Sequence, residues 1–202
     1  MVQLMIIRHG ETVENANNIC QGQQHGCLSE LGIRQARQLG VQLKEEPLDL
    51  VYSSDLQRTI DTANEILKFH PEMKLITDPL LRERSLTSWE GKAFPKNWSW
   101  DYLPEGAETN EDMLERAEQF IDKMLRLHDG QRVAAITHGG LIRAFWTVLA
   151  NKPASEYFSW EVTKNTSVSR VELYADGRHR VVELNNVDHL DAETPGTMQH
   201  FS

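Results

Sequence analysis

Short apolar runs that alternate with amphipathic helical patterns constrain this chain more than any other feature of its sequence. Strand-like runs occur at residues 3–7, 48–53, 74–78 and 132–137, and helical spacing of apolar residues occurs at 29–45, 55–69, 109–128 and 140–150. Residues 168–184 predict a β-hairpin with Asp176 and Gly177 at its turn. This alternation predicts an α/β fold, a three-layer α/β/α sandwich with a mostly parallel mixed sheet.

The length of 202 residues suits one domain with a real core. We expect residues 1–190 to form that domain and 191–202 to be a loose C-terminal tail without periodicity. Residues 92–106 contain proline, glycine and clustered aromatic residues between the regular patterns. This segment predicts an excursion near one end of the sheet that could act as a lid.

The charge and composition limit the classes of partner. The formal net charge of −9 argues against nucleic acid or an anionic membrane surface as a partner, although a pocket can be positive inside an acidic protein. No signal peptide or membrane span is expected, because the apolar patch from Leu4 to Ile7 is followed at once by Arg8. Cys20 and Cys27 are too few for a disulfide framework, and although they could pair, we expect a reduced cytoplasmic protein.

Two of the predicted strands stop at a His-Gly pair, in "IIRHG" and in "AAITHGG". The carboxyl ends of parallel strands lie at one edge of a sheet, where open α/β sheets bind ligands. His9 and His138 should therefore lie close together if the two strands are neighbours. A turn at Gly10 would direct both Arg8 and His9 into one pocket and let an anion approach the backbone.

Two further segments add charge at the same edge. Arg58 lies one turn into the helix after "VYSS", and Glu83 lies in "LLRERSLTSWEG". Arginines bind phosphoryl oxygens bidentately, an imidazole can attack phosphorus, and a carboxylic acid can protonate a leaving oxygen. Two guanidinium groups with a protonated histidine could neutralise a phosphoryl group without a metal.

Competing readings of these residues are weaker. His9, His138 and Glu83 could hold a divalent metal, but there is no dense run of ligands and Arg8 would repel a cation. No GxxxxGK[ST] or GxGxxG loop predicts a nucleotide cofactor, and Ser53 and Ser54 lie outside any GxSxG elbow. We therefore predict no metal and no cofactor.

Six motifs occur in one order along the chain, "RHGET" with Asn15, "LSELGIRQA", "VYSSDLQRTIDTA", "LLRERSLTSWEG", "PEGAETNEDMLER" and "THGG". In these motifs the chain resembles the histidine phosphatase superfamily, also called the phosphoglycerate mutase-like family, from Leu4 to about Leu190. The motif order and the "NTSVSRVEL" ending are most similar to the bacterial broad-specificity and α-ribazole-type phosphatases of the cobalamin pathway.

The resemblance implies a role for each matching residue. His9 would be the nucleophile that becomes phosphohistidine, and Glu83 would be the general acid and then the base. The phosphoryl group would be bound by Arg8, Arg58 and His138. The remaining pocket residues implied are Asn15, Gln21, Gly22 and Gly139.

The sequence departs from the family pattern at two places. Many members have Asp where this chain has His25, and an aromatic-Gly pair where it has Leu86 and Thr87. These positions bear on the substrate rather than on the reaction. Trp98, Trp100 and Tyr102 could form an apolar wall for the leaving group, or could be core or subunit contacts.

The function expected from the resemblance is a metal-independent phosphomonoesterase acting on a small phosphorylated metabolite, and a homodimer is left open. A phosphoglycerate mutase is the first alternative, but residues 92–103 lack the paired arginines of the mutases it resembles. A more open site that admits water favours hydrolysis. A non-catalytic phosphate-binding module is the second alternative, and the presence of both His9 and Glu83 counts against it.

Overall fold

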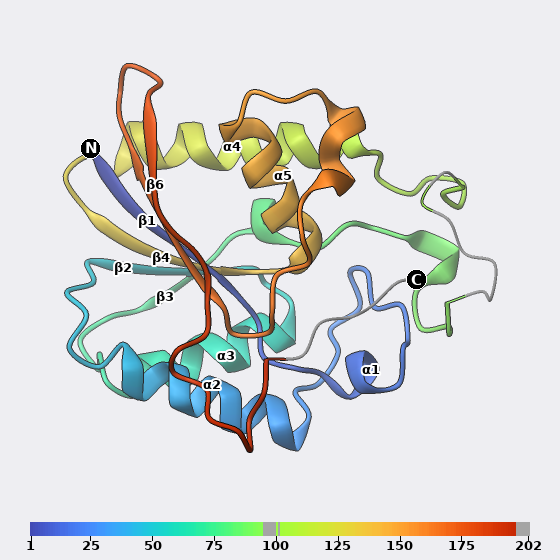
Figure 1. The fold of residues 1–202 in the computed structure, drawn as a ribbon, viewed down its shortest axis with the longest axis horizontal. Coiled ribbons are helices and arrows are strands. Elements are labelled where there is room, and N and C mark those ends of the chain that lie inside the picture. Colours follow the sequence, from blue (N-terminus) through green and yellow to red (C-terminus); the bar gives the residue numbers. More distant parts are fainter. Residues whose placement is uncertain (95–99, 101, 197–202) are drawn as a thin grey trace.

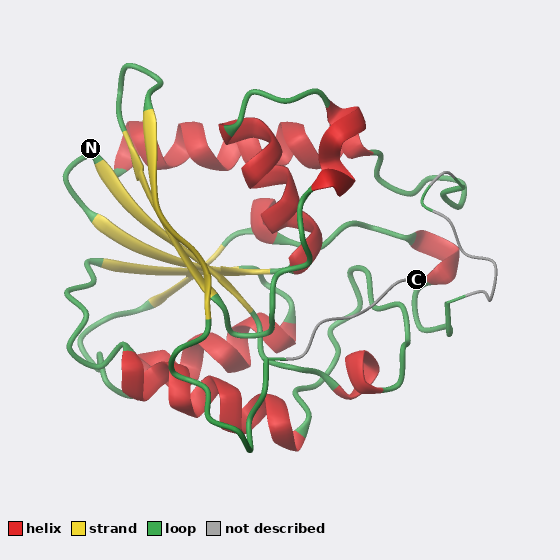
Figure 2. Cartoon of the chain, in the orientation of Figure 1, coloured by secondary structure: helices red, strands yellow, loops and turns green. Residues whose placement is uncertain are grey.

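One six-stranded sheet separates two layers of helices in the computed structural model, which describes residues 1–94, 100 and 102–196 (Figures 1 and 2). The strands are β1 (Val2–Arg8), β2 (Leu50–Ser53), β3 (Leu75–Thr77), β4 (Arg132–Thr137), β5 (Val168–Leu173) and β6 (His179–Asn186). The helices are α1 (Val13–Ala16), α2 (Glu30–Gln42), α3 (Gln57–Leu67), α4 (Asn110–Leu127) and α5 (Gly139–Leu149). Short 3₁₀ turns η1 (Pro79–Leu81), η2 (Thr87–Trp89) and η3 (Ala154–Ser159) complete the described elements.

The strand order is β3-β2-β4-β1-β5-β6. Strands β1 to β4 pair in parallel, whereas β5 is antiparallel to both β1 and β6. The β5–β6 hairpin turns through Gly177, whose φ of 83° lies in the left-handed region that glycine adopts without strain. The predicted three-layer α/β fold with a mostly parallel mixed sheet is therefore confirmed.

The strand pattern supplies one apolar face to each helical layer. Ile6 packs in the cluster under α4 and α5, and its neighbour Ile7 packs in the cluster under α2 and α3. Successive residues of a strand point to opposite faces, so a continuous apolar run is what a sheet covered on both sides requires. Figure 1 shows the two helix pairs on opposite sides of the sheet.

Helix ends follow the capping signals in the sequence. Ser29 caps α2 by accepting a hydrogen bond from the Gly32 N–H, and Thr109 and Asp112 form a reciprocal capping box at the start of α4. The helices predicted at 29–45 and 55–69 are shorter in the structure, at 30–42 and 57–67, because the outermost residues form caps and turns.

Strand register brings the candidate residues to one edge of the sheet. Arg8 at the end of β1 pairs with Thr137 at the end of β4, so His9 and His138 follow neighbouring strand ends. Ser53 at the end of β2 pairs with Ile136. The backbone at Gly10 is closely approached, as expected, but by protein backbone and not by an anion. A Cβ at Gly10 would lie 2.7 Å from the Gly32 carbonyl oxygen of α2.

Two of the predicted segments lie partly outside the described residues. For the lid excursion these are residues 95–99, which include Trp98, and residue 101, and for the tail they are residues 197–202. Tyr102 is 77% exposed and does not line the pocket described below, so its predicted part in an apolar wall is wrong. Cys20 and Cys27 are both free. Within the described ranges, no helix combines the length and the apolar character needed to cross a membrane.

Candidate active site

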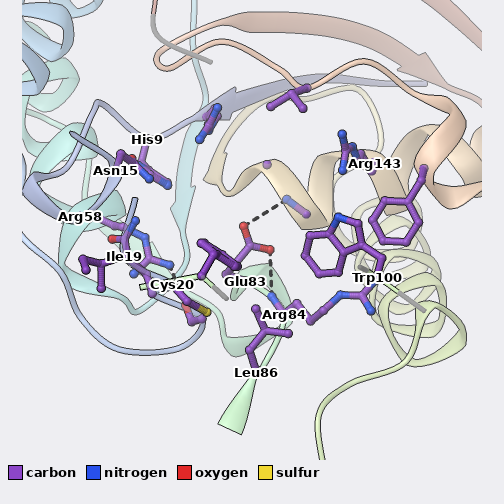
Figure 3. A pocket seen from close by; sticks show the side chains of 18 of the residues that line it. His9, Asn15, Ile19, Cys20, Arg58, Glu83, Arg84, Leu86, Trp100 and Arg143 are labelled. Carbon is purple, nitrogen blue, oxygen red and sulfur yellow. Dashed lines mark hydrogen bonds between the residues drawn. The ribbon is translucent and has the colours of Figure 1, made fainter. Parts of the chain in front are cut away.

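A basic pocket opens at the carboxyl edge of the sheet (Figure 3). Its lining includes all of the residues named from the sequence except His138, namely Arg8, His9, Asn15, Gln21, Gly22, Arg58, Glu83 and Gly139. Four arginines and one glutamate line it, so the pocket is positive although the chain is acidic overall. Such a pocket favours an anion.

His9 is buried, and a hydrogen bond to the Gly10 carbonyl fixes the orientation of its ring. Its Nδ1 lies 2.7 Å from the Gly10 carbonyl oxygen, which can only accept, so Nδ1 carries the hydrogen and Nε2 keeps its lone pair. Burial, with smaller contributions from Arg58 and Arg8, lowers the pKa of His9 well below 6.5. The imidazole is therefore neutral at pH 7, which is the form that can act as a nucleophile.

His138 lies behind His9 with its ring centroid 5.2 Å from that of His9, and it is fully buried. Its Nδ1 accepts a hydrogen bond from Arg58 Nε at 3.2 Å, so its hydrogen is on Nε2, a buried atom without a partner among the described residues. Burial and the charge of Arg58 lower the pKa of His138 well below 6.5. The protonated histidine that the sequence allowed is therefore not favoured for His138, which offers a neutral N–H donor.

Arg8 presents one edge of its guanidinium to the pocket. Its Nη1 donates to the Thr163 carbonyl, while Nε is buried and has no partner within the described chain. Burial lowers the pKa of Arg8 to about 10, so it stays charged at neutral pH. The Nε–H and Nη2–H edge is the fork that binds two oxygens of one phosphoryl group.

Arg58 is largely occupied by protein. Its Nε donates to His138, Nη1 donates to the Gln24 carbonyl at 2.5 Å and the His25 carbonyl at 3.2 Å, and Nη2 donates to the Gly22 carbonyl at 2.8 Å. A guanidinium has five N–H groups, so little of the predicted bidentate grip is left for a ligand. Arg58 thus supplies charge and holds the 22–25 loop, and its pKa is lowered by burial to about 10.

Glu83 points into the pocket from the segment after η1. One carboxylate oxygen accepts from the Gly140 N–H at 3.1 Å, and the other accepts from the Arg84 N–H at 2.9 Å (Figure 3). Arg116 fixes the backbone here by donating to the Glu83 carbonyl at 3.2 Å. Within the described part of the chain, backbone N–H groups position the carboxylate, and no ion pair does so.

The remaining predicted positions are placed as follows. Asn15 is buried and accepts from the Thr12 N–H, and Gln21 Oε1 is buried without a partner in the described chain. Gly22, with φ of 50°, would bring a Cβ within 2.2 Å of Glu90 Oε1. Of the departures from the family pattern, Leu86 lines the pocket, whereas His25 contacts Arg58 only through its carbonyl.

Sequence reasoning named only Trp100 in the far wall of the pocket and missed its other members, Arg84, Arg143, Tyr157 and Phe158. Trp100 stacks on Phe158 with ring centroids 4.8 Å apart, which fits the apolar wall expected of Trp100. The signal for Arg143 was present, because it is the one charged residue in the apolar segment "GLIRAFWTVLA". That segment predicts a buried helix, and a lone charge in such a helix needs a reason.

The fold and this pocket define an α/β protein with an anion site that contains a neutral imidazole and a carboxylate. The chain belongs to the histidine phosphatase superfamily (branch 1), whose family model matches residues 4–187. The prediction of that family, and of an enzyme of the histidine phosphatase type, is confirmed.

Three relatives illustrate the range of the family. A metal-independent phosphoserine phosphatase of Arabidopsis thaliana is 32% identical over 95% of this chain and 84% of its own length. Phosphoglycerate mutase-like protein 4 of the same plant is 30% identical over 94% of this chain and 87% of its own length. The vanadate complex of a mycobacterial glucosyl-3-phosphoglycerate phosphatase superposes with a TM-score of 0.81 at 27% identity, covering 91% of this chain and 98% of that one.

Proposed function

We propose that this chain is a metal-independent phosphomonoesterase that hydrolyses a small phosphorylated metabolite through a phosphohistidine on His9. The observation that carries the proposal is the state of His9, a neutral imidazole with Nδ1 held by Gly10 and a free Nε2 in a pocket lined by arginines. An unprotonated nitrogen beside buried cations is suited to attack an anionic phosphoryl group.

The first step forms a bond between His9 Nε2 and phosphorus and breaks the bond from phosphorus to the alcohol oxygen. Glu83, protonated at that stage, gives its proton to the departing oxygen. In the second step Glu83, now a carboxylate, takes a proton from water, whose oxygen attacks phosphorus. The N–P bond breaks, inorganic phosphate forms, and neutral His9 and protonated Glu83 are restored.

The surrounding residues stabilise the charge that is being transferred. The free edge of Arg8 binds two phosphoryl oxygens, and the Nε2–H of His138 donates to a third. Arg58 contributes its charge from behind and orients His138 through Nδ1. The Gly10 carbonyl accepts from Nδ1–H and stabilises the positive charge that His9 develops when it is phosphorylated.

The comparisons support hydrolysis and a metabolite-sized substrate. One relative at 32% identity is named a metal-independent phosphoserine phosphatase, and one solved neighbour is a glucosyl-3-phosphoglycerate phosphatase. In the described part of the chain, no group of three or more His, Cys, Asp or Glu residues is arranged to hold a metal ion. Both cysteines are free thiols, which supports the reducing cytoplasm as the place of action.

The experiment that tests this function compares His9→Ala and Glu83→Gln with wild type on an aryl and an alkyl phosphate. We expect His9→Ala to abolish turnover of both and EDTA to change neither rate. Glu83→Gln should lose on the order of 10²–10⁴-fold on the alkyl ester and much less on the aryl ester, whose leaving group needs little protonation. The exposed His179→Ala variant is the control. Full activity of His9→Ala would refute the proposal.

A mutase is the second candidate, because one relative at 30% identity is named a phosphoglycerate mutase-like protein. A mutase must keep water away from the phosphohistidine, so its phosphoenzyme would be long-lived in the absence of an acceptor. Transfer of label from a bisphosphorylated glycerate to a monophosphoglycerate, faster than release of phosphate, would favour the mutase over the phosphatase.

A further inference from the structure

Arg143 is a charged residue that the proposed reaction does not use. It lies in the second turn of α5, which is otherwise apolar, and it is half-buried in the wall of the pocket. Its guanidinium carbon is 5.5 Å from the ring centroid of Phe158. Among the described residues its guanidinium has no hydrogen bond and no ion pair to a carboxylate, whereas the guanidinium of its neighbour Arg84 donates to the Glu108 carbonyl and to Asn110.

The position of Arg143 relative to Glu83 gives the direction of the leaving group. In Figure 3 His9, Asn15 and Arg58 lie on one side of the pocket, Arg143 and Trp100 lie on the other, and Glu83 lies between them. An acid that protonates the leaving oxygen must lie beside that oxygen. The rest of the alcohol therefore extends past Glu83 toward Arg143.

We propose that Arg143 binds a carboxylate on the leaving alcohol, so that the preferred substrates are short phosphomonoesters of hydroxy acids. This inference rests on the proposed function and extends it to the substrate class. An unpaired, half-buried guanidinium is costly unless it gains an anionic partner, and here the pocket is where that partner would enter. The two Nη groups of Arg143, which have no hydrogen-bond partner among the described residues, can donate to the two oxygens of a carboxylate.

A carboxylate fits this wall better than a second phosphoryl group. The first phosphoryl group has two arginines and a histidine N–H around it, whereas the described residues of this wall offer one uncommitted guanidinium. Arg84 is held by its two hydrogen bonds and lies over the Tyr157 ring at 4.8 Å. One guanidinium beside an aromatic ring suits a planar anion with a single charge, such as a carboxylate.

The first test measures kcat/KM for a matched pair of esters, 3-phosphoglycerate and glycerol 3-phosphate, which differ only in a carboxylate against a hydroxymethyl group. Wild type should prefer the carboxylated ester, and Arg143→Gln should reduce that preference by roughly 10–100-fold. The ratio is the readout, so any general loss of activity cancels. Arg143→Lys should keep part of the preference, and the exposed Arg34→Gln should keep all of it.

A preference that changes by less than about threefold in Arg143→Gln would overturn the inference, since the lost pair is worth at least about tenfold.

The second test measures binding without turnover. Calorimetry compares 3-phosphonopropionate with propylphosphonate, and wild type should bind the carboxylated compound at least about tenfold more tightly, with Arg143→Gln showing no difference.

The binding measurement separates this inference from the proposed function. If wild type hydrolyses neither ester but shows the carboxylate preference in binding, the proposed hydrolysis fails and the Arg143 site stands. If wild type hydrolyses both esters through His9 but neither assay depends on Arg143, the Arg143 site fails and the hydrolysis stands.

Discussion

Replacing Gly32 with alanine tests how the nucleophile is held. Gly32 lies in the first turn of α2, where a Cβ would be only 1.9 Å from the Glu11 carbonyl oxygen and 2.8 Å from the Glu11 nitrogen and carbonyl carbon. Ordinary contacts of a Cβ begin at 3.4 Å, so the Cβ of an alanine here would lie 1.5 Å too close to the carbonyl oxygen (3.4 Å less 1.9 Å). All three Glu11 atoms belong to the backbone, so no side-chain rotation can relieve the clash.

The expected loss of stability follows from two opposing terms. In a helix, Gly→Ala is normally favourable by about 1 kcal/mol, whereas overpacking costs about 1–3 kcal/mol or more. We expect Gly32→Ala to be destabilised by about 2 kcal/mol, which lowers Tm by roughly 4–8 °C in a chain of this size. Glu11 is two residues from His9, so a shift of about 1 Å should also reduce kcat on the order of 10²-fold.

The assay combines thermal unfolding with turnover at a temperature where the variants are folded. Gly40→Ala is the matched control, because Gly40 lies in the same helix as Gly32 but does not line the pocket. A Cβ at Gly40 would lie 2.5 Å from the Glu65 carbonyl oxygen of α3. Gly40→Ala should lose stability without the specific loss of kcat. A Gly32→Ala protein that is as stable as wild type and fully active would refute this account of the turn.

Three further predictions concern charge and protonation. Arg8→Lys keeps the charge but removes the guanidinium fork, so kcat/KM should fall on the order of 10²-fold in steady-state assays, and a loss below threefold would argue against bidentate binding. In the free enzyme the His9 imidazole should show an NMR titration midpoint well below 6.5, because burial lowers its pKa, and a midpoint at or above 6.5 would contradict the neutral nucleophile. Burial lowers the pKa of His189 to about 4, below its value of 6.5 when unfolded, so stability is fully present above about 6.5 and is lost as the pH falls toward 4. At pH 5 this loss should be about 1–2 kcal/mol after allowance for partial exposure, and denaturant curves of His189→Asn should show a correspondingly weaker pH dependence, whereas an equal dependence would exclude His189 as its source.

The architecture was predictable because apolar periodicity and strand ends are local signals. Ile6 and Ile7 face opposite layers, and the His-Gly pairs after two strands meet because β1 and β4 are neighbours. The motifs also named the residues of the pocket that carry the proposed chemistry, including Arg8, His9 and Glu83.

The parts that were not predicted depend on tertiary contacts. Arg58 donates hydrogen bonds to the carbonyls of a loop more than thirty residues away in sequence, and these bonds occupy most of its guanidinium. The neutral state of His138 follows from burial beside Arg58, which no spacing reveals. Gly10 meets Gly32 of α2, a contact that sequence spacing does not specify, and the helical pattern around Arg143 indicated only a buried face.

Transient phosphorylation of His9 can be observed by rapid-quench trapping with a ³²P-labelled phosphomonoester. We expect a phosphoenzyme that is labile in acid and stable in base, forms within one turnover, and is mapped by mass spectrometry to His9. Label should be absent from His9→Ala, and it should form at a normal rate but disappear slowly in Glu83→Gln when an aryl ester is used. Steady turnover with no labelled protein at any quench time, or label on another residue, would show that His9 is not the nucleophile.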